Sequence, residues 1–419
     1  MTVFTNKPTV TPTAKMPAAK WLTVVGIGED GIDGLSEQAK AAISGADLVF
    51  GGSRHLALAA PLITAQAQPW PTPFDSTLAA VRAVRGEAVC VLASGDPMLH
   101  GVGATLSRVF AADEMQVLPM PSAFSLAASR LAWPLAEVTT LSLHGRDVAH
   151  VRRYLQPGRK LLVLTSDSQG PAAMAAYLCD HGLGGTTLTV LEALGGSGEK
   201  IHRSHAASFQ PRDIHPLNLL AVEIAADATA DFLPLAPGIA DDWFDHDGQI
   251  TKRDIRALTL SALQPLPGQL LWDIGGGAGS IAIEWLLQDP SMRAVSVERH
   301  AERAARIARN AQRLGVPDLT VMTAAAPAAY ANLPPPDAVF IGGGGSNMAV
   351  IDGAIKALRA GGRLVVNAVT LETENQLITA HKNHGGRLLR LALAEAQAVG
   401  KLTGWRAAMP VTQWSWSKP

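Results

Sequence analysis

The sequence predicts an α/β protein built from at least two domains. Three observations support this fold class. The chain has 419 residues, more than one ordinary core accommodates. Short apolar runs alternate with helical patterns from Leu22 onward. Glycine-rich turns follow several of these runs, so we expect parallel strands whose faces are covered by helices.

Composition excludes several classes of function. The formal net charge of −1 provides no basic field for nucleic acid, so an anionic substrate must be held by local arginines. Cys90 and Cys179 lie in apolar patterns and form neither a disulfide framework nor a metal box, so we expect a reducing cytoplasm and no metal. No run approaches the roughly 18 apolar residues of a membrane span. Residues 1–19 contain no signal-peptide core and are expected to be a disordered tail.

The first half of the chain, residues 20–232, predicts two successive sheets. Two sheets leave a cleft between them, which is a common position for a small-molecule site. The expected strands are 22–25, 48–50, 88–93, 116–119, 161–165, 187–193 and 219–224, with a further strand and loop at 141–146. The expected helices are 36–44, 76–84, one after Gly101, one that ends at Leu131, and 171–181.

The loop from Ser94 to Gly101 follows a strand that is apolar on both faces. Ligands of open α/β sheets bind beyond the carboxyl ends of strands, so this loop is well placed for a ligand. A plain turn that uses glycine and proline as punctuation explains the spacing equally well. The residues alone leave both interpretations open.

The second half begins after residues 233–244, whose prolines and glycine predict a linker. Thr251 is the expected N-cap of a helix that continues to Leu263. Residues 245–419 then alternate as in a Rossmann-like sheet. The expected strands are 270–274, 294–298, 319–322, 337–341 and 363–367, the helices are 280–288, 301–314 and 349–358, and a closing antiparallel pair is expected from 388–393 and 405–416.

A glycine-rich turn joins the first strand and helix of this half. Asp273, Gly275, Gly277 and Gly279 form the pattern Asp-x-Gly-x-Gly-x-Gly, and the amides at the start of the following helix favour electronegative groups. A dinucleotide fingerprint would require glycine at Ser280. Glu298 ends the next strand, where it can accept from both hydroxyls of a ribose. A turn without a ligand is the alternative, but the order of strand, turn, helix and acid disfavours it. The pattern resembles the S-adenosylmethionine site of class I methyltransferases.

The motifs of the first half resemble those of another family. GIG at 26–28, SGDPMLHG at 94–101, PSAFSLA at 121–127, LSLHGR at 141–146 and LTVLEALGGSGEKI at 188–201 resemble the tetrapyrrole methylases, the class III methyltransferases, and especially their precorrin-6Y branch. This resemblance implies a two-lobed fold with S-adenosylmethionine in the cleft. The implied cofactor residues are Gly28, Ser94, Gly95, Asp96, Pro97, Gly101, Ser122 and Leu191. Glu29-Asp30 after Gly28, and His100, depart from the family pattern.

Residues 245–419 resemble the decarboxylating C15 methyltransferases that act on precorrin intermediates. Gly343 and Gly344, in the loop after the fourth strand, would lie beside the transferred methyl group. Ala324–Pro327 stands where relatives carry Gly-Asp-Ala-Pro, and losing that acid's hydrogen bond to adenine would weaken binding by roughly 1–3 kcal/mol. The implied cofactor residues are Thr251, Asp273, Gly275, Gly277, Gly279, Glu298, Ala325 and Ala326.

Methyl transfer from a sulfonium requires alignment and exclusion of water rather than a metal. Loss of carbon dioxide needs an electron sink, which the conjugated imines of a tetrapyrrole provide. Four cations are candidates for binding its carboxylates, and solvated surface charge is the alternative for each: Arg146, Lys252, Arg253 and Arg256. His144 is the candidate for moving a proton, although a structural role is the commoner one. The charges of helix 301–314 predict a solvated face.

These resemblances predict a bifunctional enzyme of cobalamin biosynthesis that forms precorrin-8. The N-terminal domain would methylate C5, and the C-terminal domain would methylate C15 and remove the carboxyl of an acetate side chain. Each domain would bind one S-adenosylmethionine and release S-adenosylhomocysteine, and we expect a homo-oligomer. One alternative is that a single domain is catalytic and the other binds cofactor or supports assembly. A nucleic-acid methyltransferase is disfavoured because no Asn/Asp-Pro-Pro-aromatic motif follows Asp337.

Overall fold

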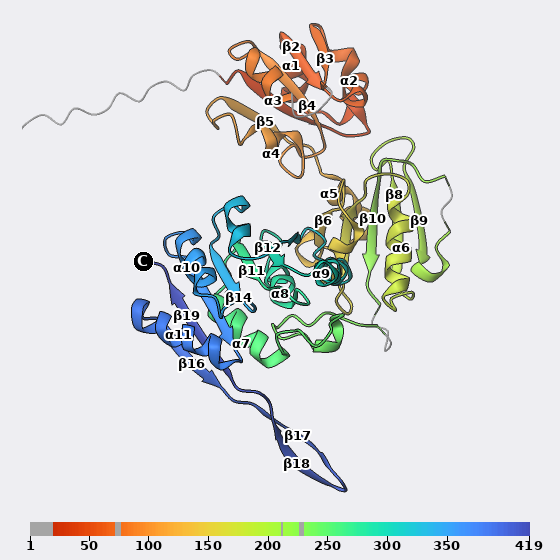
Figure 1. Ribbon diagram of the computed structural model, residues 1–419. Coiled ribbons are helices and arrows are strands. Elements are labelled where there is room, and N and C mark those ends of the chain that lie inside the picture. The colour runs from red at the N-terminus through yellow and green to blue at the C-terminus, as the bar shows by residue number, and fades with distance from the viewer. Residues whose placement is uncertain (1–19, 72–76, 211–212, 226–229) are drawn as a thin grey trace, which may run out of the picture. The chain divides into compact units, whose positions relative to one another are not determined.

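The computed structural model describes residues 20–71, 77–210, 213–225 and 230–419 (Figure 1). The tail expected at 1–19 lies outside these residues. The chain divides into two compact units. The first contains the described residues up to Gly145 together with Arg159–Ala225, and the second contains Arg146–Gly158 and the described residues after Ala225.

The first sheet of the first unit is fully parallel, with the strand order β3-β2-β4-β1-β5. Its central strand β4 is buried from Val89 to Ala93, as its apolar run predicts. The polar strand β3 and helix α2 carry no apolar period and were not predicted. The strands are β1 (Leu22–Ile27), β2 (Leu48–Gly51), β3 (Gln66–Pro69), β4 (Val89–Ser94) and β5 (Met115–Leu118), and the helices are α1 (Glu37–Ser44), α2 (Ser53–Ala59), α3 (Thr77–Ala83) and α4 (Val102–Leu106).

The second sheet of this unit is mixed, with the order β6-β7-β10-β8-β9. Only β6 and β7 pair in parallel. The edge strand β9 is exposed along almost its whole length, which explains why no apolar run marks it. The strands are β6 (Thr139–Ser142), β7 (Lys160–Leu164), β8 (Thr187–Glu192), β9 (Lys200–His205) and β10 (Asn218–Glu223), and the helices are α5 (Ala123–Leu131) and α6 (Gly170–Asp180).

The second unit is organised around a seven-stranded sheet of order β13-β12-β11-β14-β15-β19-β16. The first five strands are parallel, and the strand order reverses between β11 and β14, where open sheets bind ligands. The strands are β11 (Leu270–Ile274), β12 (Arg293–Glu298), β13 (Thr320–Thr323), β14 (Ala338–Ile341), β15 (Arg363–Ala368), β16 (Arg387–Leu391) and β19 (Val411–Ser417). The helices are α7 (Arg253–Leu263), α8 (Ser280–Gln288), α9 (Ala301–Arg313), α10 (Met348–Ala357) and α11 (Leu371–His384).

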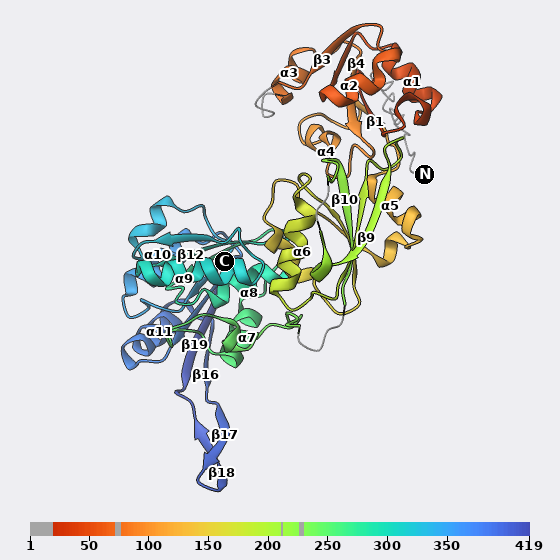
Figure 2. The same ribbon diagram turned by 90° about the vertical axis from the view of Figure 1, so that its right-hand side faces the viewer.

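The closing pair of this sheet differs from the prediction. β16 and β19 are antiparallel neighbours, but the expected strand 405–416 is divided. Its first part belongs to β18 (Leu402–Ala407), which pairs with β17 (Ala394–Val399) in a separate hairpin. This β17–β18 arm extends away from the seven-stranded sheet in both views (Figure 2).

Two segments of the second unit were predicted to lie outside it, one in a linker and one in the first half of the chain. The predicted linker places Leu233, Ile239 and Phe244 in the core of this unit, each at most 3% exposed. The short 3₁₀ helix Val148–Tyr154 interrupts the first unit in sequence, yet it is grouped with the second. There the Arg153 side chain donates to the Leu286 carbonyl over 2.8 Å. None of the described helices has the length and apolar character that a membrane crossing requires.

Candidate active sites

The glycine-rich turn of the second unit requires glycine at two positions for steric reasons. Gly275 and Gly277 have φ values of +74° and +59°, which side chains rarely adopt. A Cβ on Gly275 would lie 2.7 Å from Gly343 Cα, and one on Gly277 would lie 2.7 Å from the Gln249 carbonyl oxygen. The loops after β11 and β14 and the segment before α7 therefore meet at one edge of the sheet.

Two carboxylates lie beneath this turn and are almost inaccessible. Glu298, 4% exposed, accepts from the Gly277 and His300 amides over 3.0 Å each, and each oxygen keeps a second lone pair. Asp273 is 1% exposed. Burial, together with the nearby Glu298 carboxylate, raises the pKa of Asp273 to about 7. Asp273 Oδ2 and Ser296 Oγ are buried without a hydrogen-bond partner in the described part of the chain.

This arrangement fits a ligand that carries hydrogen-bond donors. The glycines let three backbone segments meet at this edge, while Asp273 and Glu298 offer acceptors, as ribose hydroxyls and an α-ammonium group require. S-adenosylmethionine carries both groups. Among the described residues, no group of three or more His, Cys, Asp or Glu side chains is arranged to hold a metal ion.

The other residues implied by the class I resemblance occupy the same edge. Ala325 and Ala326 follow β13, and the neighbouring Ala324 amide donates to the Glu298 carbonyl over 3.1 Å. Gly343 and Gly344 follow β14, where the Gly343 amide bonds the Ile274 carbonyl over 3.3 Å. Thr251 precedes α7, close to Gln249. It is not the N-cap as predicted: Lys252 takes that position and makes no side-chain cap bond.

Two predictions about surface charge in this unit were wrong. Arg256 is fully buried, so it is not available to bind substrate carboxylates. Its Nε donates to Glu284 over 2.5 Å, and Nη1 donates to Asp241 over 3.1 Å. Arg306 in α9 is only 8% exposed and pairs with Asp247 over 3.1 Å, so that helix face is not fully solvated. Lys252 and Arg253 are exposed, as the sequence predicts.

Four residues of the predicted class III site converge in the first unit. Gly28 follows β1, Ser94 is the last residue of the neighbouring strand β4, and Gly95 follows it. Gly95 has φ +51°, and a Cβ there would lie 3.2 Å from Ser122 Cα. Ser122 caps α5 by accepting from the Ser125 amide over 3.1 Å. The sheet edge therefore brings three loops together.

The rest of the Ser94–Gly101 loop is a compact turn. Asp96 accepts from the Met98 amide over 2.8 Å, and a Cβ on Gly101 would lie 2.6 Å from the Pro97 carbonyl oxygen. Leu191 is placed differently. Its side chain is fully buried in the core cluster of α5 and β8, and its assignment to the cofactor site stays a prediction.

His144 and Arg146 lie together on the exposed loop after β6. The Gly145 amide between them donates to Ser166 over 2.8 Å. No hydrogen bond or ion pair among the described residues joins either side chain to the cluster around Ser94. Their assignment to catalysis therefore remains a prediction.

Sequence reasoning missed a polar group at this site. Arg54 and His55 begin α2 and contact Ser94, and Arg54 also forms an ion pair with Glu29 in the loop after β1. The available signal was their position shortly after the predicted strand 48–50. Ligands of open α/β sheets bind beyond the carboxyl ends of strands, and this rule applies to strand 48–50 as it does to the strand before Ser94. Glu29 also approaches the loop after β8: a Cβ on Gly196 would lie 2.7 Å from Glu29 Cβ.

The chain resembles known proteins along most of its length. Residues 21–210 match the family model of the tetrapyrrole (corrin/porphyrin) methylases, and residues 242–418 match that of the precorrin methyltransferase domain. Precorrin-6Y C(5,15)-methyltransferase [decarboxylating] of a Sinorhizobium species is 56% identical over 398 residues, which cover 95% of this chain and 96% of that protein.

Two shorter relatives match part of the chain. Cobalt-precorrin-7 C(5)-methyltransferase of Salmonella typhimurium is 31% identical over 181 residues, 43% of this chain and 89% of its own. A probable cobalt-precorrin-6B C(15)-methyltransferase (decarboxylating) of Saccharolobus solfataricus is 36% identical over 155 residues, 36% of this chain and 78% of its own. With both family models matched and the full-length relative covered almost end to end, the chain belongs to the precorrin-6Y C(5,15)-methyltransferase (decarboxylating) family.

Proposed function

We propose that this chain methylates precorrin-6Y at C5 and C15 and removes the carboxyl group of an acetate side chain, giving precorrin-8 in cobalamin biosynthesis. The first unit carries the C5 transfer, and the second carries the C15 transfer and the decarboxylation. One observation carries the proposal: each unit has its own glycine-rich sheet edge, and each matches a different methyltransferase family. The names of the two shorter relatives divide the activities in the same way.

Each unit binds one S-adenosylmethionine, which supplies the methyl group from its sulfonium. In the second unit, Asp273 and Glu298 accept hydrogen bonds from the cofactor, and Gly275 and Gly277 let it approach the backbone. Buried acceptors in the second unit and the crowded glycines of the turn support this role. In the first unit, Gly28, Ser94, Gly95 and Ser122 form the corresponding edge.

The protein contributes alignment rather than covalent chemistry. The reduced tetrapyrrole supplies a nucleophilic enamine-like carbon, and its conjugated imines accept the electron pair released on decarboxylation. Gly343 and Gly344 lie beside the methyl group and carry no side chain that would obstruct the macrocycle. Holding the reacting carbon close to the methyl group accounts for most of the acceleration.

The test distinguishes a chain in which both units are catalytic from a chain in which one unit is catalytic and the other only binds cofactor or supports assembly. Gly277→Val should abolish C15 methylation and decarboxylation while C5 methylation continues, and Gly95→Val should do the reverse. Gly361→Val and Gly86→Val are matched controls, because both positions have positive φ but no atom within 4 Å of the added Cβ. Mass spectrometry of the product from each variant reads the result. Loss of both methyl transfers in either folded site variant would contradict the proposal.

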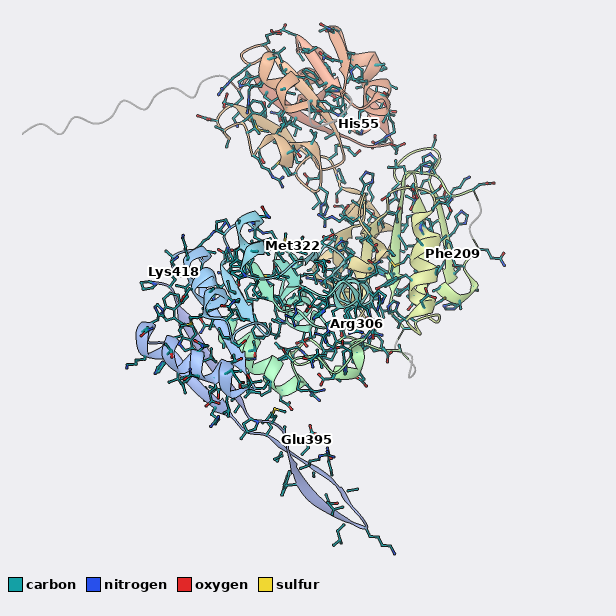
Figure 3. The ribbon with its side chains drawn as sticks, viewed as in Figure 1. His55, Phe209, Arg306, Met322, Glu395 and Lys418 are labelled. Atoms are coloured by element: carbon teal, nitrogen blue, oxygen red, sulfur yellow. The ribbon has the colours of Figure 1, made fainter. Side chains whose placement is uncertain are left out.

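We also propose a homo-oligomer in the cytoplasm, joined through the β17–β18 arm. Isolated two-stranded hairpins are marginally stable in water, and this arm exposes Val399, Leu402 and Trp405 by 65–80%. Both cysteines are free thiols, which suits a reducing compartment. Figure 3 shows Glu395 of the arm apart from the side chains of the sheet. Analytical ultracentrifugation should show that Trp405→Ser shifts the protein to smaller species, whereas the exposed Leu235→Ser leaves it unchanged.

A further inference from the structure

A serine, a histidine and an arginine contact one another at the carboxyl edge of the first sheet. His55 Nε2 lies 2.8 Å from Ser94 Oγ, and Arg54 Nη2 lies 2.9 Å from both of these atoms. Ser94 ends β4 and is exposed, whereas His55 is half-buried behind it. Figure 3 labels His55 on this lobe. The serine hydroxyl is therefore the accessible end of the group.

The hydrogen bonds determine the protonation state of His55. Arginine only donates, so His55 Nε2 must accept from Arg54 and the ring proton must lie on Nδ1. Ser94 Oγ also accepts from Arg54, so its own hydrogen shares the single lone pair of His55 Nε2 with Arg54 in a three-centre hydrogen bond. Nδ1 is buried and has no hydrogen-bond partner among the described residues. The imidazole is thus neutral, with its accepting nitrogen facing an exposed hydroxyl.

The charges around His55 keep it in this state. Burial, together with the nearby Arg54 cation, lowers the pKa of His55 to about 4. Glu29, from the loop after β1, is paired with Arg54, and Asp96, in the loop after β4, is engaged by the Met98 amide. His55 is therefore an unprotonated base throughout the neutral range, and an acquired proton would be released quickly.

The proposed C5 transfer requires a proton acceptor. When a ring methine carbon takes a methyl group, the new C–CH₃ bond forms as the S–CH₃ bond breaks, and the carbon then carries both hydrogen and methyl beside a cationic conjugated system. The C–H bond must break so that its electron pair returns to the ring. Because that C–H bond is acidic, a weak neutral base is sufficient to accept the proton.

We propose that Ser94 and His55 form the relay that removes this proton. Ser94 Oγ takes the proton from the methylated carbon as it passes its own hydrogen to His55 Nε2, and the imidazolium then releases a proton to water. Arg54 positions both groups and disfavours a long-lived imidazolium. This inference rests on the proposed assignment of C5 methylation to the first unit.

The test replaces the base while keeping its hydrogen bonds. In His55→Gln, the amide oxygen can still accept from Arg54 and Ser94 but takes up no proton. We expect formation of the deprotonated C5-methylated product in single turnover to slow about 100-fold, the usual contribution of a general base, with S-adenosylhomocysteine affinity within threefold of wild type. Precorrin-6Y deuterated at the methine carbon should show a primary isotope effect in the variant that is absent from wild type.

The control and the contrary outcomes are distinct. His205→Gln removes an exposed histidine of β9 and should change neither rate nor isotope effect. Ser94→Ala serves if His55→Gln misfolds, and it should also slow proton loss and reveal the isotope effect. Unchanged rates, or a loss of S-adenosylhomocysteine binding that explains the whole defect, would overturn the relay. A separate result would show that the first unit does not carry the C5 transfer: C5 methylation would then continue in the Gly95→Val variant.

Discussion

The two sheet edges that form the candidate sites differ in where they keep their polar groups. In the second unit, Asp273 and Glu298 are buried beneath the glycine turn, and Glu298 is bonded to two backbone amides. In the first unit, the polar group around Ser94 lies at the surface or half-buried, and the arginine there is paired with an acid.

This difference predicts different responses to substitution. A buried ionised group is stabilised by a partner inside the protein even before a ligand binds. Removing one member of such a pair leaves the other as a buried charge without a counter-charge. Exposed pairs are screened by water and contribute little to stability. Substitution of polar residues in the second unit should therefore change its folding stability. Substitution of polar residues in the first unit should mainly change binding and catalysis.

The largest expected effect is on Arg256. Arg256→Met leaves Glu284 buried without its cation and should lower the free energy of unfolding by about 3–5 kcal/mol. Denaturant titration of the full chain, followed through the tryptophans of the second unit, measures this change. Arg359→Met is the matched control, because its pair with Asp337 is exposed and should contribute at most about 1 kcal/mol. Equal losses in both variants would remove the distinction between buried and exposed charge.

Asp273 should show opposite effects on stability and binding. The pKa of its carboxyl is about 7 in the folded state, above the ordinary value in the unfolded chain. The folded state thus binds the proton more tightly, so stability falls as pH rises through this window. Asp273→Asn should raise the Tm more at pH 8 than at pH 5 while weakening cofactor binding at one site at least tenfold, since the lost hydrogen bond to a charged group is worth about 1.5–3 kcal/mol.

The control for this pair of measurements is Asp352→Asn, an exposed position in α10. Its melting temperature should follow that of wild type at both pH values. If Asp273→Asn instead lowered the Tm at pH 8, the buried carboxylate would be a net source of stability, and the predicted cost of ionising it in the folded state would be wrong.

The smallest effect is expected for the ion pair between Arg130 and Glu199 in the first unit. Arg130 Nε donates to Glu199 over 2.6 Å, but the arginine side chain is 39% exposed. Arg130→Ala should therefore cost at most about 1 kcal/mol, and less at high salt because ions screen the pair. Thermal melts at low and high ionic strength test this. A cost as large as that of Arg256→Met would show that exposure does not distinguish the two units.

Much of the fold could be predicted because the central strands are apolar on both faces. β4 is predicted in this way, and its carboxyl end points to Ser94, whereas the glycine spacing points to Asp273 and the family resemblance to Gly343. β9 and the β17–β18 arm carry no comparable apolar run, because their residues face solvent on both sides.

The site errors have a different origin. Arg256 belongs to a helix pattern that predicts exposure, and its burial depends on Glu284, 28 positions later, which supplies the compensating charge. Arg306 belongs to a helix face that is expected to be solvated, and its burial accompanies its ion pair with Asp247. Both errors concern tertiary contacts, which local sequence patterns do not encode.

The number of S-adenosylhomocysteine molecules bound per chain tests the account most directly. Equilibrium dialysis of the full-length protein should give two per chain, falling to one in Gly277→Val and to one in Gly95→Val, with Gly361→Val and Gly86→Val retaining two. A single bound molecule in the wild-type protein, lost completely in either site variant, would contradict two separate cofactor sites.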